Sequence, residues 1–193
     1  MRLTLASTSP RRLDLLRSLG WDPIPLDPGL DDAAEAALAR EAHARGLDPG
    51  EVALRLGLAK LLAGLRQAAP ELPVLAADTV IAFGGALIGK PRDREHARDL
   101  LQGFAGQSHE VSTGVALVDA SGALRCATSS TQVRMKDFDA ATLEAFLDTD
   151  LWRGKAGGYG VQDPESAPLV AEVLGSESNV RGLPLEVVKE LLG

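Results

Sequence analysis

The chain has 193 residues, of which 45% are hydrophobic, so it is long and apolar enough to bury a core, and we expect residues 1–193 to form a single domain. Its net charge of −7 argues against a general nucleic-acid binder or a protein that binds anionic membranes, because both usually carry a basic surface. Cys126 is the only cysteine, which excludes an intrachain disulfide, and no apolar run is long enough to span a bilayer. These features predict a cytoplasmic protein.

The first twelve residues place two serines, a proline and two arginines after a short apolar stretch. Residues 3–5 are typical of a strand, and Ser9 followed by Pro10 is typical of the start of a helix. A helix N-terminus offers free backbone N–H groups, so Arg11 and Arg12 beside it would form an anion site, with phosphate the obvious ligand. The alternative is a solvated first turn that carries two surface arginines.

The next segment is extended and interrupted by prolines, and it leads into two predicted helices. Asp31 or Asp32 can cap an Ala-rich helix over residues 33–46. Residues 48–67 predict a second helix, whose large apolar side chains we expect on or near one face: Val52, Leu54, Leu58, Leu61, Leu62 and Leu65. Lys60 lies among these leucines and is one of five lysines in a chain with fifteen arginines.

Residues 73–83 form an almost wholly apolar run of strand-forming residues that is interrupted by Asp78 and Thr79. The pattern predicts a central strand buried on both faces, and a Gly84–Gly85 turn follows it. A buried carboxylate is costly unless a cation or hydrogen bonds compensate its charge. We therefore expect Asp78 to face a metal ion or a polar cleft, the alternative being a capping or turn aspartate at the strand end.

The rest of the chain continues to alternate helices and strands. We expect helices over 92–106, 140–149 and 183–193, an antiparallel hairpin over 109–135, a strand over 167–175, and loops over 151–163 and 176–182. This order predicts a mixed α/β (α+β) fold. Lys90 and Lys155 lie in Gly-rich turns, where an ammonium group can approach a ligand closely, the alternative being chance placement on the surface.

Several well-known catalytic motifs do not occur in the sequence. It has no Walker-type phosphate loop, HExxH zinc motif, cysteine pair or GxSxG elbow, and we expect its three histidines to be structural or surface residues. What remains is a set of oxygen ligands and cations: Asp31, Asp32, Asp78, Arg11, Arg12, Lys60, Lys90 and Lys155. Carboxylates that hold Mg²⁺ or Mn²⁺, together with basic side chains that bind phosphate oxygens, are the apparatus of phosphoryl or nucleotidyl chemistry.

Five segments, in order, also resemble the motifs of a known family. They are LASTSPRR, AADTVIAFGGALIGKPRD, HEVSTGVALV, GKAGGYGVQ and GSESNVRGLPLE, and they are similar to motifs of the Maf (septum formation inhibitor-like) nucleotide pyrophosphatases over nearly the whole chain. The SPRR, DT and YGVQ elements resemble the branch that acts on dTTP and UTP rather than the branch that acts on 7-methyl-GTP. The resemblance implies an elongated central sheet with two lobes around a cleft, similar to inosine triphosphate pyrophosphatases, and often a homodimer.

The resemblance also implies roles for single residues. Asp78 matches the family's proton acceptor, and its specificity-setting positions match Arg11, Thr79 and Gln162. The triphosphate cleft would be lined by Ser7, Arg12, Lys60, Lys90 and Lys155. Asp32 stands where the family usually has a glutamate, so Asp32 and Asp78 are the expected ligands of a divalent metal cation, Mg²⁺ or Mn²⁺. The alternative for Gln162 is a loop residue that faces solvent.

The residues and the resemblance together predict a nucleoside triphosphate pyrophosphatase that converts dTTP and UTP to the monophosphate and pyrophosphate. Two alternatives remain open: a pyrophosphatase for another, modified or purine, nucleotide, and a nucleotide-sensing regulator of cell division without turnover. A buried acid at Asp78 favours the enzyme over the sensor. The expected partner is the nucleotide, with neither nucleic acid nor membrane.

Overall fold

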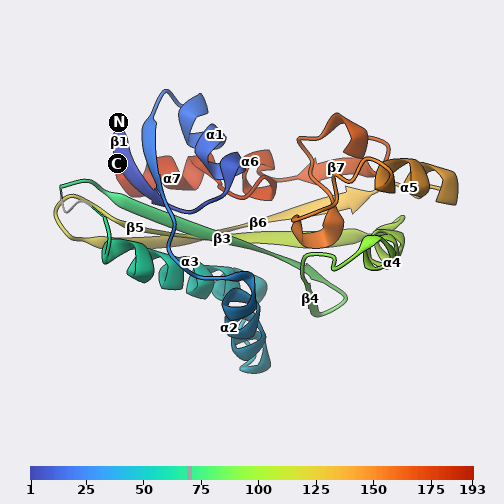
Figure 1. Cartoon of the computed structure of the whole chain (residues 1–193), viewed down its shortest axis with the longest axis horizontal. Coiled ribbons are helices and arrows are strands. Elements are labelled where there is room, and N and C mark those ends of the chain that lie inside the picture. The colour runs from blue at the N-terminus through green and yellow to red at the C-terminus, as the bar shows by residue number, and fades with distance from the viewer. Residues whose placement is uncertain (69–70) are drawn as a thin grey trace.

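We describe the fold from a computed structural model, which describes residues 1–68 and 71–193. Within these residues seven strands form one mixed sheet that extends along the length of the molecule (Figure 1). The strands are β1 (Arg2–Ala6), β2 (Asp22–Leu26), β3 (Val74–Phe83), β4 (Ala86–Ile88), β5 (Ser108–Val118), β6 (Leu124–Met135) and β7 (Val170–Leu174). Their order is β2-β1-β3-β5-β6-β7, and β4 pairs with β3. β1 pairs in parallel with β2 and β3, and the other pairs are antiparallel, which confirms the predicted mixed α/β class.

The helices cover both faces of the sheet (Figure 1). On one face lie α1 (Pro10–Ser18), α6 (Glu177–Val180) and α7 (Leu185–Leu192), and on the opposite face lie α2 (Asp32–Ala44) and α3 (Pro49–Leu65). At the end of the sheet away from the two termini lie α4 (Arg94–Phe104) and α5 (Ala140–Leu147). Two 3₁₀ turns, η1 (Ala156–Gly158) and η2 (Pro164–Ser166), precede β7. No helix among the described residues has the length and apolar character that a membrane crossing needs.

Most predicted elements are confirmed because their local signals are strong. Asp31 accepts a hydrogen bond from Ala34 N at 2.8 Å and so is the N-cap of α2, and Asp139 caps α5 in the same way. The hairpin predicted over residues 109–135 is the β5–β6 pair. The extended segment after α1 contains the edge strand β2, where two prolines are tolerated because an edge strand has one unpaired side.

Two expectations about elements are wrong. Residues 176–182, expected as a loop, contain the single-turn helix α6, whose residue Asn179 is buried and donates hydrogen bonds to Val111 O and Thr131 Oγ1. In α3, Leu62 and Leu65 were expected on the apolar face but are 61% and 37% exposed. The buried face of α3 combines glycines such as Gly57 and Gly64 with Leu56 and Leu61, so Leu62 and Leu65 fall outside it.

Candidate active site

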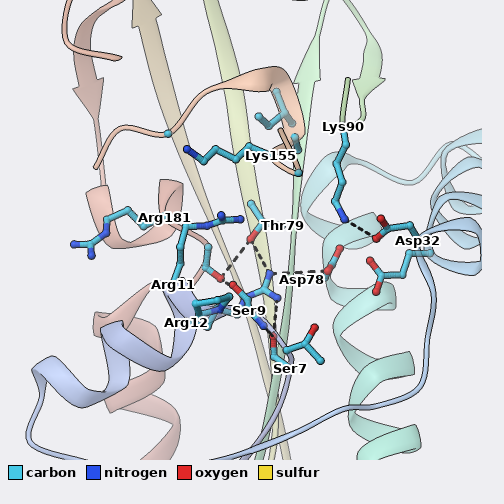
Figure 2. A pocket seen from close by; sticks show the side chains of 18 of the residues that line it. Ser7, Ser9, Arg11, Arg12, Asp32, Asp78, Thr79, Lys90, Lys155 and Arg181 are labelled. Carbon is cyan, nitrogen blue, oxygen red and sulfur yellow. Dashed lines mark hydrogen bonds and ion pairs between the residues drawn. The ribbon is translucent and has the colours of Figure 1, made fainter. Parts of the chain in front are cut away.

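A cleft of about 390 Å³ lies where β1, β3 and the segment before β7 meet (Figure 2). All ten residues that the sequence singled out as site residues line it: Ser7, Arg11, Arg12, Asp32, Lys60, Asp78, Thr79, Lys90, Lys155 and Gln162. Basic side chains outnumber acidic ones along its walls, although the chain as a whole is acidic. The cleft is therefore suited to an anionic ligand. Asp31, counted among the oxygen ligands, is used instead as the cap of α2.

The N-terminal wall of the cleft is the turn between β1 and α1. Ser9 occupies the N-cap position of α1, as predicted, but its side chain makes no capping hydrogen bond. Instead Ser9 N donates to Ser7 Oγ at 3.2 Å, which folds the turn back on itself. The N-terminus of α1 is thus left without a side-chain cap beside Arg11, which also lines the cleft. An uncapped helix N-terminus next to a guanidinium group is a favourable environment for phosphate.

Arg12 is buried and holds three segments together. Its Nε donates to Gly182 O at 2.7 Å, and its terminal nitrogens donate to Ser7 Oγ and Thr79 Oγ1, both at 3.3 Å. Burial lowers the pKa of the Arg12 guanidinium, and attraction to Asp78 opposes that shift. Arg12 is therefore both a structural link and a buried positive charge on the floor of the cleft.

Asp78 lies in the middle of β3, is 7% exposed and faces the cleft. Its Oδ1 accepts a hydrogen bond from Lys60 Nζ and lies 3.9 Å from a terminal nitrogen of Arg12. Two cations thus compensate the buried carboxylate, as the sequence argument required. Lys60 Nζ also lies 2.8 Å from Glu35 Oε1, so one ammonium joins two carboxylates. Asp78 is not a strand-end capping residue.

Close packing of α3 on the sheet explains how Lys60 reaches Asp78. A Cβ added at Gly57 of α3 would lie 2.9 Å from Gly114 O of β5, and one added at Gly114 would collide with the backbone of Leu54. Glycine at these two positions therefore lets the helix backbone rest directly on the strands. Lys60 is three residues beyond Gly57 on the same helix face and is buried. The short separation between helix and sheet places its Nζ at Asp78.

Asp32 lies at the mouth of the cleft rather than beside Asp78. Its Oδ1 is 2.5 Å from Lys90 Nζ, and the two side chains are 75% and 46% exposed (Figure 2). The acid of α2 that shares Lys60 with Asp78 is Glu35, one turn further along the helix, which sequence reasoning missed. The spacing of three residues on one helix face was the available signal, because it places Asp32 and Glu35 side by side.

The carboxylates of the cleft fit a divalent cation that is bound together with phosphate. Among residues 1–68 and 71–193, no group of three or more His, Cys, Asp and Glu side chains is placed to hold a metal ion by itself. Mg²⁺, however, is usually bound by one or two carboxylates and completed by water and substrate phosphates. Asp32, Glu35 and Asp78 line the same cleft and supply the hard oxygen donors that such a cation requires.

The far wall of the cleft is the glycine-rich segment before β7. Gln162 lies in a turn, is half-buried and lines the cleft, which is the location that its predicted role requires. Its Nε2 donates to Asp163 Oδ1 at 3.0 Å, and Lys155 Nζ pairs with the other oxygen of Asp163. Asp163 was missed by the sequence analysis. Its only signal was its position next to a predicted specificity residue.

Two further residues of the cleft were not predicted. Tyr159 is buried, and its hydroxyl lies 2.6 Å from Nε2 of His109, whose ring stacks on Phe104. Burial raises the pKa of Tyr159 and lowers the pKa of His109 to about 4, so His109 is neutral near pH 7. Arg181 lines the cleft, and its buried Nε has no hydrogen-bond partner among the described residues.

Comparison with known proteins gives likenesses over almost the full chain. The family model described as Maf-like protein matches residues 2–193. The chain is 40% identical over 193 residues to the dTTP/UTP pyrophosphatase of Alkalilimnicola ehrlichii, with 97% of this chain and 90% of that protein covered. It is 38% identical over 191 residues to the dTTP/UTP pyrophosphatase of Agrobacterium fabrum, with 99% and 90% covered. Among solved structures, a HAM1 protein from Coxiella burnetii has a TM-score of 0.49 and 16% identity, with 100% and 98% covered.

Proposed function

The chain belongs to the Maf-like protein family, and on that premise we propose that it hydrolyses dTTP and UTP to the nucleoside monophosphate and pyrophosphate. The observation that carries the proposal is the buried Asp78, held between Lys60 and Arg12 on the floor of a cleft with a surplus of basic side chains. A nucleoside triphosphate brings the negative charge that this cleft is suited to bind. The named activity of the relatives supplies the reaction and the bases.

The triphosphate is bound by the cationic walls of the cleft. The uncapped N-terminus of α1 offers donors from one side, and Lys90 and Lys155 reach in from the other (Figure 2). Lys90 and Lys155 are now paired with Asp32 and Asp163, so each would exchange a carboxylate for phosphate oxygens when substrate binds. This exchange limits the desolvation cost of binding.

Asp78 then acts as the proton acceptor for the attacking water. The water oxygen forms a bond to the α-phosphorus while its proton passes to the Asp78 carboxylate. The bond from the α-phosphorus to the bridging oxygen breaks, and its electron pair leaves with pyrophosphate. A divalent cation held by Asp32 or Glu35 together with Asp78 and the phosphates would neutralise the charge on this leaving group.

The base would be recognised by Gln162, Arg11 and Thr79. Uracil and thymine present carbonyl acceptors at O2 and O4 and a donor at N3, which an amide can meet with one acceptor and one donor. Arg11 can donate to the remaining carbonyl, and Thr79 beside Asp78 would help to place the ring. Cytosine reverses the donor and the acceptor at two of these positions. A site that pairs with uracil therefore rejects cytosine.

The test is a substrate screen with identified products. The purified chain is incubated with dTTP, UTP, CTP, GTP and 7-methyl-GTP in the presence of Mg²⁺ or Mn²⁺, in water enriched in ¹⁸O. We expect dTTP and UTP to be preferred, with ¹⁸O in the monophosphate, because the water attacks the α-phosphorus. Release of inorganic phosphate, or ¹⁸O in pyrophosphate, would refute this reaction. Preference for a purine nucleotide would indicate the related specificity, and binding without turnover would indicate a sensor.

A further inference from the structure

Asp163 is in contact with both predicted ligand-binding residues of the far wall. Its Oδ1 accepts a hydrogen bond from Gln162 Nε2 at 3.0 Å, and its Oδ2 is paired with Lys155 Nζ. The carboxylate is 17% exposed and the Lys155 side chain 13% exposed, so the cluster is largely shielded from water. Lys155, Gln162 and Asp163 therefore form one polar cluster in the far wall of the cleft.

A carboxylate in this position determines which way the Gln162 amide points. An ionised carboxylate only accepts hydrogen bonds, whereas an amide has a donor end and an acceptor end. The end of the Gln162 amide that faces Asp163 must therefore be its NH₂ group. Rotation of the amide by 180° would place Oε1 against the carboxylate, lose the hydrogen bond and bring two acceptors together. The donor and acceptor order that Gln162 offers to a ligand is thus fixed.

We propose that Asp163 is a positioning residue for base selection, which locks the Gln162 amide in the one orientation that accepts uracil or thymine and rejects cytosine. The inference rests on the proposed function. With the amide locked, its Oε1 meets the N3–H donor of uracil, and its second N–H meets a carbonyl oxygen. Cytosine in the same pose would set acceptor against N3 and donor against the C4 amine. A freely rotating amide would match either base by turning over, so without the lock Gln162 alone discriminates poorly.

Gly160 gives independent support for a built cluster. A Cβ added at Gly160 would lie 2.7 Å from Asp163 Oδ2 and would collide with Gln162 Nε2. The space beside the Gly160 backbone is therefore filled by the very amide and carboxylate that form the lock. A side chain at residue 160 would have to displace one or both of them, although the backbone there does not require glycine, because its φ is not in the left-handed region.

Asp163 also contacts Lys155, so the effect of a substitution on the base contact must be separated from its effect on Lys155. Lys155 is expected to bind the triphosphate, which is the same in UTP and CTP. Removing the Asp163 charge therefore changes the pairing of Lys155 for both nucleotides alike, and this effect cancels in the ratio of their kcat/KM values. A change in that ratio reports the base contact, whereas general damage to the loop lowers both values together.

The experiment compares kcat/KM for UTP and CTP in the wild type and in three variants. Asp163→Asn keeps the size of the side chain, but its amide can donate or accept, so both orientations of Gln162 are then satisfied. We expect the UTP-to-CTP ratio to fall at least about tenfold in Asp163→Asn, since the mismatched donor and acceptor pairs no longer oppose cytosine. Gly160→Ala should lower the ratio in the same direction. Asp150→Asn is the matched control, because this exposed residue of the same loop pairs with Arg153 and should leave the ratio unchanged.

The outcomes separate the inference from the proposed function. If the wild type hydrolyses UTP in preference to CTP and both Asp163→Asn and Gly160→Ala keep that ratio within about twofold, the lock is wrong and the proposed function stands. If Asp163→Asn fails to fold, the ratio in Gly160→Ala decides. If the wild type hydrolyses neither UTP nor dTTP, the proposed activity is wrong. If it does not distinguish UTP from CTP, the proposed base preference is wrong. In both cases the inference about Asp163 is wrong as well.

Discussion

At the scale of single residues, the site depends on how buried charges are shared. Lys60 Nζ contacts Asp78 and Glu35, and Arg12 uses Nε and both terminal nitrogens to bind Gly182, Ser7 and Thr79. Arg12 therefore remains anchored if a neighbouring charge is removed. This redundancy makes it possible to change the chemistry of Asp78 while the surrounding structure persists.

We expect Asp78→Asn to lower kcat by at least about 100-fold, because the amide keeps the shape of the carboxylate but cannot accept the proton of water. The fold should be retained, since Lys60 keeps Glu35 as a partner and Arg12 keeps its three hydrogen bonds. The measurements are kcat on dTTP and UTP and the far-UV circular dichroism spectrum. Asp14→Asn, on the exposed face of α1, is the control and should behave as the wild type. Near-normal rates in Asp78→Asn would make Asp78 a purely structural residue.

Removal of divalent cations should stop the reaction. When Lys90 and Lys155 turn to the phosphates, the carboxylates of Asp32 and Asp163 lose their partners, so basic side chains alone do not neutralise the combined negative charge. We expect excess chelator to abolish activity and added Mg²⁺ or Mn²⁺ to restore it. Asp32→Ala should raise the metal concentration for half-maximal rate about tenfold. Full activity in chelator would exclude the cation, whereas a shift in Glu35→Ala alone would transfer the ligand role from Asp32 to Glu35.

The sequence predicted which residues line the cleft better than how they are paired. Arg11, Arg12 and Asp78 stood out because charged groups beside a helix start or inside an apolar strand need a reason to be there. Glu35 and Asp163 did not stand out, because acidic residues are common on helix surfaces and in loops. Their importance comes from contacts with Lys60 and Gln162, which only the tertiary fold creates.

At the scale of elements, the separation between α3 and the sheet controls the site. Gly57 of α3 faces Gly114 of β5, and the helix delivers Lys60 to Asp78 one turn later. Sequence periodicity indicated the helix but not this contact, because it weighs large apolar residues and ignores glycine. For the same reason, periodicity placed Leu62 and Leu65 on or near the apolar face, although they are 61% and 37% exposed. Local sequence signals determine where a helix forms, whereas the shape of the sheet surface determines which face of the helix packs against it.

We therefore expect Gly57→Ala to destabilise the protein although alanine favours helix formation. Its Cβ would lie 2.9 Å from Gly114 O, so the helix must move away, at a cost of about 1–3 kcal/mol in the free energy of unfolding. Gly103→Ala in α4 is the matched control, because no atom lies within 4 Å of its added Cβ, and it should raise stability by about 0.5–1 kcal/mol. Urea denaturation measures both changes. Equal effects of the two substitutions would contradict the close-packing argument.

At the scale of the whole molecule, the distribution of charge separates the cleft from the rest of the surface. The chain carries a net charge of −7, yet basic side chains are in surplus around one cleft. Because salt screens charges over about 10 Å, the basic side chains of the cleft can favour a small anion at short range although the chain as a whole is acidic. The acidic composition predicts that the basic residues are concentrated in one region. It does not predict where that region lies, because only the tertiary fold brings residues 7–12, 60, 90, 155 and 181 to one cleft.

The stability of the whole fold in acid depends on His109. This residue connects the α4 end of the core to the cleft, since it stacks on Phe104 and its Nε2 bonds to the hydroxyl of Tyr159. Burial lowers its pKa from 6.5 to about 4, so between these values the unfolded chain binds a proton that the native protein does not. Its neutral form therefore stabilises the fold fully above pH 6.5, and this contribution is lost as the pH falls toward 4.

We expect the free energy of unfolding to fall by about 2 kcal/mol between pH 7 and pH 5 through His109 alone. The carboxylates whose pKa is lowered, such as Glu144 with a pKa of about 2, lose their contribution only below their unfolded pKa of 4.5, so they affect a more acidic range. Urea denaturation at a series of pH values measures the slope in the wild type, in His109→Gln and in His43→Gln. The slope between pH 7 and pH 5 should flatten in His109→Gln and persist in His43→Gln, because His43 is exposed. The comparison uses slopes because His109→Gln also removes the contacts with Phe104 and Tyr159, which lowers stability at every pH. An unchanged slope in His109→Gln would mean that the buried imidazole does not control acid stability.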